Sequence, residues 1–120
     1  MTTIEISVAP FAKARPRATR GPGVYMPRSY VASKRAAVIE MRKAWGDRRT
    51  IMETVSVTIL LITASGNMRP DIDNAAGGVL DAMQDAGILG NDKQVRRLTA
   101  TVLRGEPRTV IHIEPMAGNA

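Results

Sequence analysis

The alternation of apolar and polar residues along the chain predicts four β-strands. Residues 3–8 place an apolar side chain at every second position, which is the period of a half-buried strand. Residues 54–63 (TVSVTILLIT) are apolar on both faces, as expected for a strand in the middle of a sheet. Two more strands are predicted near residues 95–103 and 109–114.

Apolar residues at helical spacing predict a first helix between the first two strands. It begins at Ser29 or Ser33, because either residue can serve as the N-cap, and it runs to about Trp45. The candidate core positions of this helix are Val31, Ala36, Ile39, Met41 and Trp45.

A second helix is predicted after the sequence DIDN. Asp73 or Asn74 is its natural N-cap, and Gly87 is its natural C-terminal stop. One apolar stripe of this helix faces the core, and its members are Ala76, Val79, Leu80 and Met83.

The element order, β-α-β-α-β-β, predicts a mixed sheet with two main helices packed on it. This is an α/β or α+β architecture in a single small domain, residues 1–120. Residues 9–23 are rich in Pro, Gly and Arg and predict a long irregular loop. The tail from about residue 115 to residue 120 is expected to be loose.

The composition excludes several classes of protein. No stretch approaches the ~20 apolar residues that a membrane span needs. The N-terminal segment has its apolar residues before its basic ones, which is the wrong order for a secretory signal. The absence of cysteine excludes disulfides and thiolate metal sites. The expected compartment is the cytoplasm.

The charge is distributed unevenly along the chain. Residues 1–50 carry 11 basic and 3 acidic side chains, whereas residues 51–120 carry 6 basic and 8 acidic ones. A basic half beside a mildly acidic half suggests a surface for a polyanion next to a site that uses carboxylates. With only 3% aromatic residues, base stacking along a single strand is disfavoured, and contact with the backbone of folded DNA fits better.

The candidate catalytic residues follow the predicted central strand, in the sequence RPDIDN. Pro70 disfavours a helical conformation of the residue before it, and in an extended segment Asp71 and Asp73 point to the same side. Asp92 follows the second helix, roughly 20 Å long, and joins the pair only if the next turn doubles back. The alternative interpretation is an ordinary turn in which an Asp or Asn side chain caps the helix.

Three carboxylates favour a hard divalent cation, Mg²⁺ or Mn²⁺, as the cofactor. Such an ion activates a water molecule and neutralises charge on a phosphate. An EF-hand calcium loop is excluded, because Ala75 and Ala76 stand where a ligand and the obligatory Gly belong.

The block RPDIDN, with VLDA at residues 79–82 and NDKQV at residues 91–95, resembles the signature of the RusA family of Holliday junction resolvases. The segment PFAKARPR (residues 10–17), with Tyr25 and Pro27 after it, is similar to the opening segment of that family. The resemblance therefore covers most of the chain.

This resemblance implies a structure-selective endodeoxyribonuclease that resolves Holliday junctions by paired symmetric nicks, in DNA recombination and repair. It also implies that Asp71, Asp73 and Asp92 bind divalent metals and are required for cleavage. A homodimer is implied as well, because a four-way junction is two-fold symmetric and nicking opposing strands needs two equivalent sites.

One position departs from the family pattern. The family usually has a Lys four residues after the second Asp of D-x-D, where it is thought to assist catalysis, and this chain has Gly77 there, followed by Gly78. Either another cation substitutes, or the enzyme is slow, or the protein binds without cutting. The candidates for a substitute are Lys93, Arg69 and Arg97. The two glycines cost helix stability and permit close approach of a neighbouring element or of DNA.

Basic side chains are the candidate DNA contacts, and they are Lys13, Arg15, Arg17, Arg20, Arg69 and Lys93. Asp81 and Asp85 are expected on the solvated face of the second helix. His112 is expected to be an ordinary, partly buried strand residue, and Tyr25 is expected to pack rather than stack on a base.

Two alternatives to a resolvase stay open. One is a catalytically weak protein that binds branched DNA, which the glycine at position 77 motivates. The other is a small basic RNA- or DNA-binding scaffold in which the Asp cluster only caps a helix. Dependence of DNA cleavage on metal separates these interpretations.

Overall fold

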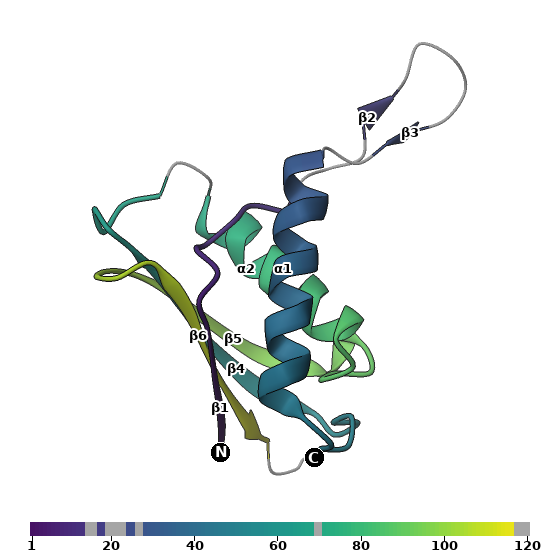
Figure 1. Ribbon diagram of the computed structural model, residues 1–120. Helices are drawn as coiled ribbons and strands as arrows, with labels where there is room; N and C mark the ends of the chain where they lie inside the picture. The colour runs from purple at the N-terminus through teal and green to yellow at the C-terminus, as the bar shows by residue number, and fades with distance from the viewer. Residues whose placement is uncertain (14–16, 19–23, 26–27, 69–70, 117–120) are drawn as a thin grey trace.

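The computed structural model describes residues 1–13, 17–18, 24–25, 28–68 and 71–116. It is an α+β domain in which a four-stranded sheet carries two helices, so the predicted fold class and element order are confirmed (Figure 1). The strands of the sheet, in spatial order, are β1 (Thr2–Ile6), β6 (Arg108–Pro115), β4 (Val55–Thr63) and β5 (Val95–Arg104). The helices are α1 (Arg28–Trp45) and α2 (Ile72–Asp85), followed by a 3₁₀ turn, η1 (Asp92–Gln94).

The sheet is mixed, as predicted, with β4 in an interior position. β4 pairs with β6 in an antiparallel manner and with β5 in a parallel manner. Every second side chain of β4 points to the helices and is fully buried, namely Val55, Val57, Ile59 and Leu61. The continuous apolar run of this segment therefore reflects its place between two neighbouring strands.

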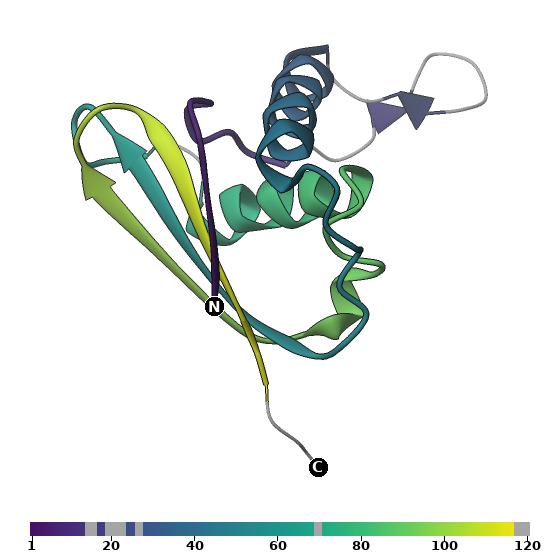
Figure 2. The same cartoon turned by 60° about the horizontal axis from the view of Figure 1, so that its bottom comes forward.

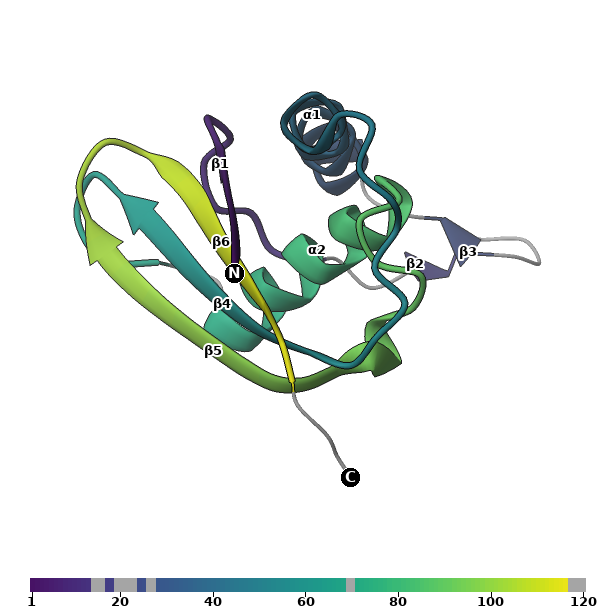
Figure 3. The same cartoon turned by 90° about the horizontal axis from the view of Figure 1, so that it is seen from below.

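Both helices lie on one face of the sheet (Figure 2). In the view from below, α1 is seen end-on, and it packs on α2 and lies beside β1 (Figure 3). One hydrophobic cluster joins the inner face of the sheet to both helices. None of the helices in the described part of the chain is long and apolar enough to cross a membrane.

The buried face of α1 differs from the predicted one. Met41 and Trp45 are in the core as expected, but Val31 and Ile39 are 38% and 48% exposed, and Ala36 is exposed too. The residues that accompany Met41 and Trp45 in the core are instead Tyr30 and Ala37. At about 100° per residue, Ile39 lies on the opposite side of the helix from this stripe.

The start of α2 also differs from the prediction, whereas its end agrees. The N-cap residue is Asp71, so Asp73 and Asn74 lie inside the first turn of the helix. At the other end, Gly87 has φ +79°, and the N–H of Ile88 donates to the carbonyl of Met83 at 3.0 Å. This left-handed residue closes the helix where the sequence predicted the stop. Of the predicted core stripe, Ala76, Val79 and Met83 are buried, and Leu80 is partly buried.

Two segments predicted to be irregular contain regular structure. Within the expected loop 9–23, β2 (Arg17–Ala18) pairs with β3 (Val24–Tyr25) as a short antiparallel ladder beyond the N-terminal end of α1 (Figure 1). At the C-terminus, Pro115 still belongs to β6, and the N–H of Met116 donates to the carbonyl of Thr54 at 3.0 Å. The rest of the tail predicted to be loose, residues 117–120, lies outside the described residues.

Candidate active site

Asp71 and Asp73 lie together at the N-terminal end of α2, and both are exposed. Asp71 has extended backbone angles, φ −63° and ψ 146°, as an N-cap residue does, but its carboxylate makes no capping hydrogen bond. Asp73 Oδ1 accepts from the N–H of Asn74 at 2.9 Å. The two carboxylates do not share an extended segment, as the sequence suggested, because only Asp71 is extended and Asp73 is helical.

Asp92 occupies the 3₁₀ turn η1, which its motif neighbours build. Asn91 is the N-cap of the turn: its side chain accepts from the N–H of Lys93 at 2.8 Å, and its own N–H donates to Gln94 Oε1 at 2.7 Å. Gln94 Nε2 also donates to the carbonyls of Ile51 and Glu53. The N-D-x-Q motif is therefore a capping box that holds the turn and leaves the Asp92 side chain exposed.

The fold places Asp92 apart from Asp71 and Asp73. The N–H of Asp92 donates to Gln84 Oε1 at 3.0 Å, so Asp92 adjoins the last turn of α2, whereas the other two aspartates adjoin its first turn. A helix of 14 residues is about 20 Å long. Among the described residues, no three His, Cys, Asp or Glu side chains are grouped to hold a metal ion. One chain thus brings together two of the three predicted ligands.

Residues 11–13 pack on the start of α2, a pairing of segments that the sequence did not predict. The N–H of Lys13 donates to the carbonyl of Asn74 at 3.0 Å, and Phe11 lies over Gly78. A Cβ atom at Gly78 would lie 3.0 Å from Phe11 Cε2 and 3.4 Å from the Phe11 carbonyl oxygen. The two consecutive glycines predicted close approach of a neighbouring element, and that element is the segment 11–13. The glycine pair was therefore the feature of the sequence that indicated this contact.

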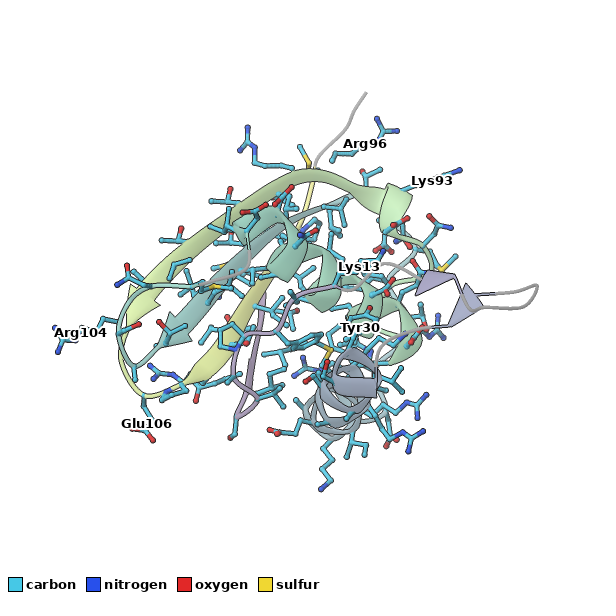
Figure 4. The ribbon with its side chains drawn as sticks, turned by 90° about the horizontal axis from the view of Figure 1, so that it is seen from above. Lys13, Tyr30, Lys93, Arg96, Arg104 and Glu106 are labelled. Carbon is cyan, nitrogen blue, oxygen red and sulfur yellow. The ribbon has the colours of Figure 1, made fainter. Side chains whose placement is uncertain are left out.

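Asp81 is the centre of a polar cluster, contrary to the expected solvated position. It accepts a hydrogen bond from the Tyr30 hydroxyl, and it lies 3.7 Å from Lys13 Nζ and 3.9 Å from Lys34 Nζ. Lys34 Nζ also lies 3.0 Å from Asp85. We call these five residues the Asp81 cluster. Figure 4 shows Lys13 and Tyr30 close together between α1 and α2, with Lys93 apart from them.

Tyr30 is the titrating group that this cluster perturbs. Its side chain is only 3% exposed, and burial raises the pKa of its phenol. The hydrogen bond to Asp81 raises the same pKa further, as do the negative charges of Asp81 and Asp85. The phenol is therefore a hydrogen-bond donor and not an anion in the folded protein.

The remaining predicted site residues have separate positions. Lys93 is exposed in η1, directly after Asp92. Arg17 is the first residue of β2, and its side chain is not described. His112 is partly buried, as expected, with Nδ1 2.8 Å from Thr3 Oγ1. The predicted DNA contacts Arg15, Arg20 and Arg69 lie outside the described residues.

Comparison with protein families identifies the chain. Residues 7–114 of the 120 match the family described as Endodeoxyribonuclease RusA. The chain belongs to the RusA family. RusA proteins are endodeoxyribonucleases that resolve Holliday junctions, act in recombination and repair, and generally depend on a divalent metal. No curated protein matches the chain closely enough to serve as a relative. Membership in a nuclease family excludes the nucleic-acid-binding scaffold of another class, and branched DNA is the substrate that the family implies.

Proposed function

We propose that this RusA protein resolves four-way DNA junctions by metal-dependent hydrolysis, with Asp71, Asp73 and Asp92 as the ligands of Mg²⁺ or Mn²⁺. The observation that carries the proposal is that the described contacts that build the fold leave out the side chains of Asp71 and Asp92, and that the Asp73 side chain accepts only from the N–H of the next residue. Asp71 occupies the N-cap position without a capping hydrogen bond, and Asn91 and Gln94 make the contacts that hold the turn around Asp92. All three aspartates are exposed.

The donor set fits a hard divalent cation. Carboxylate oxygens are the ligands that Mg²⁺ and Mn²⁺ prefer, and the chain contains no cysteine that would favour a softer metal. The bound ion supplies an activated water and neutralises charge on the phosphate. Asp71 and Asp73 would hold this cation beside the first turn of α2, where the positive end of the helix dipole also attracts the anionic DNA backbone.

A second copy of the chain completes each site in this proposal. Because α2 separates Asp92 from the D-x-D pair by about 20 Å, one chain cannot close the three ligands around one ion. Two copies related by a two-fold axis, with their α2 helices antiparallel, bring Asp92 of one copy to Asp71 and Asp73 of the other. The same symmetry matches the four-way junction and gives two equivalent sites for paired nicks.

Basic residues hold the arms of the junction in this proposal. We assign the contacts to the DNA backbone to basic residues of three segments. They are Lys13, Arg15, Arg17 and Arg20 in the N-terminal segment, Arg69 before α2, and Lys93 in η1. Contacts of this kind give affinity that is independent of sequence and decreases with salt. The excess of basic residues in the first 50 positions supports this assignment.

The test is cleavage of a synthetic four-way junction in Mg²⁺ or Mn²⁺, scored for symmetric nicks in opposing strands. We expect Asp71→Asn, Asp73→Asn and Asp92→Asn each to reduce the nicking rate by at least about 100-fold. Binding to the junction should be retained, because removing negative charge reduces repulsion of the DNA. Asp47→Asn, an exposed aspartate that follows α1, is the matched control.

The opposite results have distinct meanings. An Asp71→Asn protein that cuts at the rate of the unmodified protein would remove that residue from the site. An unmodified protein that binds the junction but does not cut it in either metal would support the alternative of a weakly catalytic binding protein, which the glycine at position 77 motivates.

A further inference from the structure

We propose that Lys13 is the catalytic cation that stands in for the family lysine absent at position 77, and that it contacts the phosphate under attack. The inference rests on the proposed metal-dependent cleavage. It starts from an observation at Gly77: a Cβ atom there would lie 3.5 Å from Lys13 Cδ and 3.9 Å from Lys13 Cβ. The side chain of Lys13 therefore runs through the space that a side chain at position 77 would enter.

The geometry of α2 puts this lysine beside the candidate metal ligands. Asp73, Gly77 and Asp81 are spaced four residues apart, so they lie on successive turns of one helix face. The Lys13 side chain crosses that face at Gly77, between the two aspartates. The backbone of Lys13 is held there by its hydrogen bond to Asn74, the residue after Asp73. The Lys13 side chain thus passes Gly77, one helical turn from Asp73, and its ammonium group lies beside Asp81, one turn further along the same face.

The contact that Lys13 makes in this structure is weak enough to be exchanged. Its Nζ lies 3.7 Å from Asp81, and the side chain is 47% exposed, so solvent screens the pair. Asp81 keeps the Tyr30 hydroxyl and Lys34 as partners when Lys13 leaves. A phosphate bound beside Asp73 therefore offers Lys13 a second anion within reach of the same side chain. In this arrangement Asp81 is a positioning residue that holds Lys13 on the face when DNA is absent.

The other substitutes that the sequence suggested fit this role less well. Lys93 and Arg97 follow Asp92, so in the proposed dimer they come to the site only from the second copy, and Arg69 lies outside the described residues. Neither Lys93 nor Arg97 is among the neighbours of Gly77. Lys13 combines a position over Gly77 with a backbone anchor next to Asp73, and these two independent contacts decide between the candidates.

The experiment measures single-turnover nicking of a synthetic four-way junction in Mg²⁺ and, separately, binding of the same junction in EDTA. We expect Lys13→Met to slow nicking by about 100-fold, the size of the loss when one charge-stabilising group is removed from a site. Junction affinity should fall by less than about tenfold, because one of several phosphate contacts is lost. Adding Gly77→Lys to Lys13→Met should restore most of the rate, since the new lysine enters the same space from the helix. The matched control is Lys34→Met, which removes the other lysine that pairs with Asp81.

A chemical version of the test avoids dependence on how Gly77→Lys packs. The chain has no cysteine, so Lys13→Cys introduces a single thiol that can be alkylated selectively. Aminoethylation restores an ammonium group at nearly the length of lysine and should restore nicking, whereas carbamidomethylation of the same protein should not.

The results separate this inference from the proposed function. If the unmodified protein nicks the junction and Lys13→Met nicks it equally fast, the role of Lys13 alone is overturned. The same holds if aminoethylated Lys13→Cys does not regain nicking. Equal losses of binding and of rate in Lys13→Met overturn it too, because they make Lys13 an ordinary backbone contact. An unmodified protein that does not nick the junction overturns the proposed function and this inference together.

Discussion

At the scale of single residues, Tyr30 shows how a buried polar group can join two helices. Its ring is in the core with the Phe11 ring centroid 6.1 Å away, and its hydroxyl donates to Asp81 on the other helix. A hydrogen bond to a charged acceptor contributes more than one between neutral groups. Tyr30 therefore ties α1, α2 and the segment that carries Lys13 together.

This arrangement predicts a loss of stability at alkaline pH. The pKa of Tyr30 is raised above its ordinary value of about 10, so the folded protein keeps a proton that the unfolded chain loses. The contribution of Tyr30 to the free energy of unfolding is complete below about pH 10 and decreases as the pH rises above that value. At neutral pH, Tyr30→Phe should lower the free energy of unfolding by about 2 kcal/mol, the hydrogen bond lost.

Urea denaturation of both proteins from about pH 8 to about pH 11 checks this. We expect the difference in unfolding free energy between the unmodified protein and Tyr30→Phe to shrink above about pH 10. A difference that is constant over the whole range would mean that the phenol titrates alike in the folded and unfolded states.

At the scale of an element, the two consecutive glycines of α2 have different tasks. A side chain at Gly78 meets the Phe11 ring at 3.0 Å, a distance that requires the ring to move, whereas a side chain at Gly77 meets, among the described residues, only Lys13 at an ordinary 3.5 Å. Gly78 lets residues 11–13 lie against the helix, and Gly77 leaves room for the Lys13 side chain. The glycine pair thus lowers the intrinsic stability of the helix but allows a remote segment to pack against it.

The difference predicts unequal responses to alanine. Gly77→Ala should raise the free energy of unfolding by up to about 1 kcal/mol, because alanine favours the helix and fits. Gly78→Ala should gain less or lose stability, because the same benefit is offset by displacement of Phe11. Urea denaturation of both variants, alone and with Phe11→Leu, measures the coupling. Equal effects of Gly77→Ala and Gly78→Ala, unaltered by Phe11→Leu, would contradict the assigned contact.

At the scale of the whole molecule, the topology separates the ends of α2. The chain leaves the end of β4, traverses α2 back along the sheet, and enters β5 parallel to β4, so Asp71 and Asp92 necessarily lie at opposite ends of the crossover (Figure 1). A carboxylate site built from both ends needs either a large rearrangement or a second copy. The proposed dimer avoids the rearrangement.

Mixed dimers test the shared site. Neither Asp71→Asn nor Asp92→Asn alone should cut, but a co-refolded mixture contains dimers in which one site has all its aspartates and the other has lost two. We expect such mixtures to regain nicking of one strand per junction. If the subunits pair at random, about half of the dimers are mixed, and this fraction limits the activity regained. Single-strand nicks and not paired ones should be seen on a labelled junction. A mixture as inactive as its components would place the three ligands within one chain.

Much of the fold and part of the site could be predicted from the sequence, because local patterns encode them. The interior position of β4 follows from its apolar run, and the end of α2 follows from the left-handed conformation that Gly87 adopts easily. The motifs around Asp71 and Asp92 were sufficient to predict the RusA family, and the family match over residues 7–114 confirms that prediction.

Only the tertiary structure decided which residues meet. Ala37 rather than Ile39 faces the core because α1 is rotated to fit against α2 and β1, and no local pattern records that rotation. Asp92 lies apart from Asp71 because the length of the crossover helix is fixed by the sheet that it spans. Lys13 reaches Gly77 across 64 residues of sequence because Phe11 docks on Gly78. Contacts between remote segments depend on how packed surfaces fit, and that is settled only when the chain has folded.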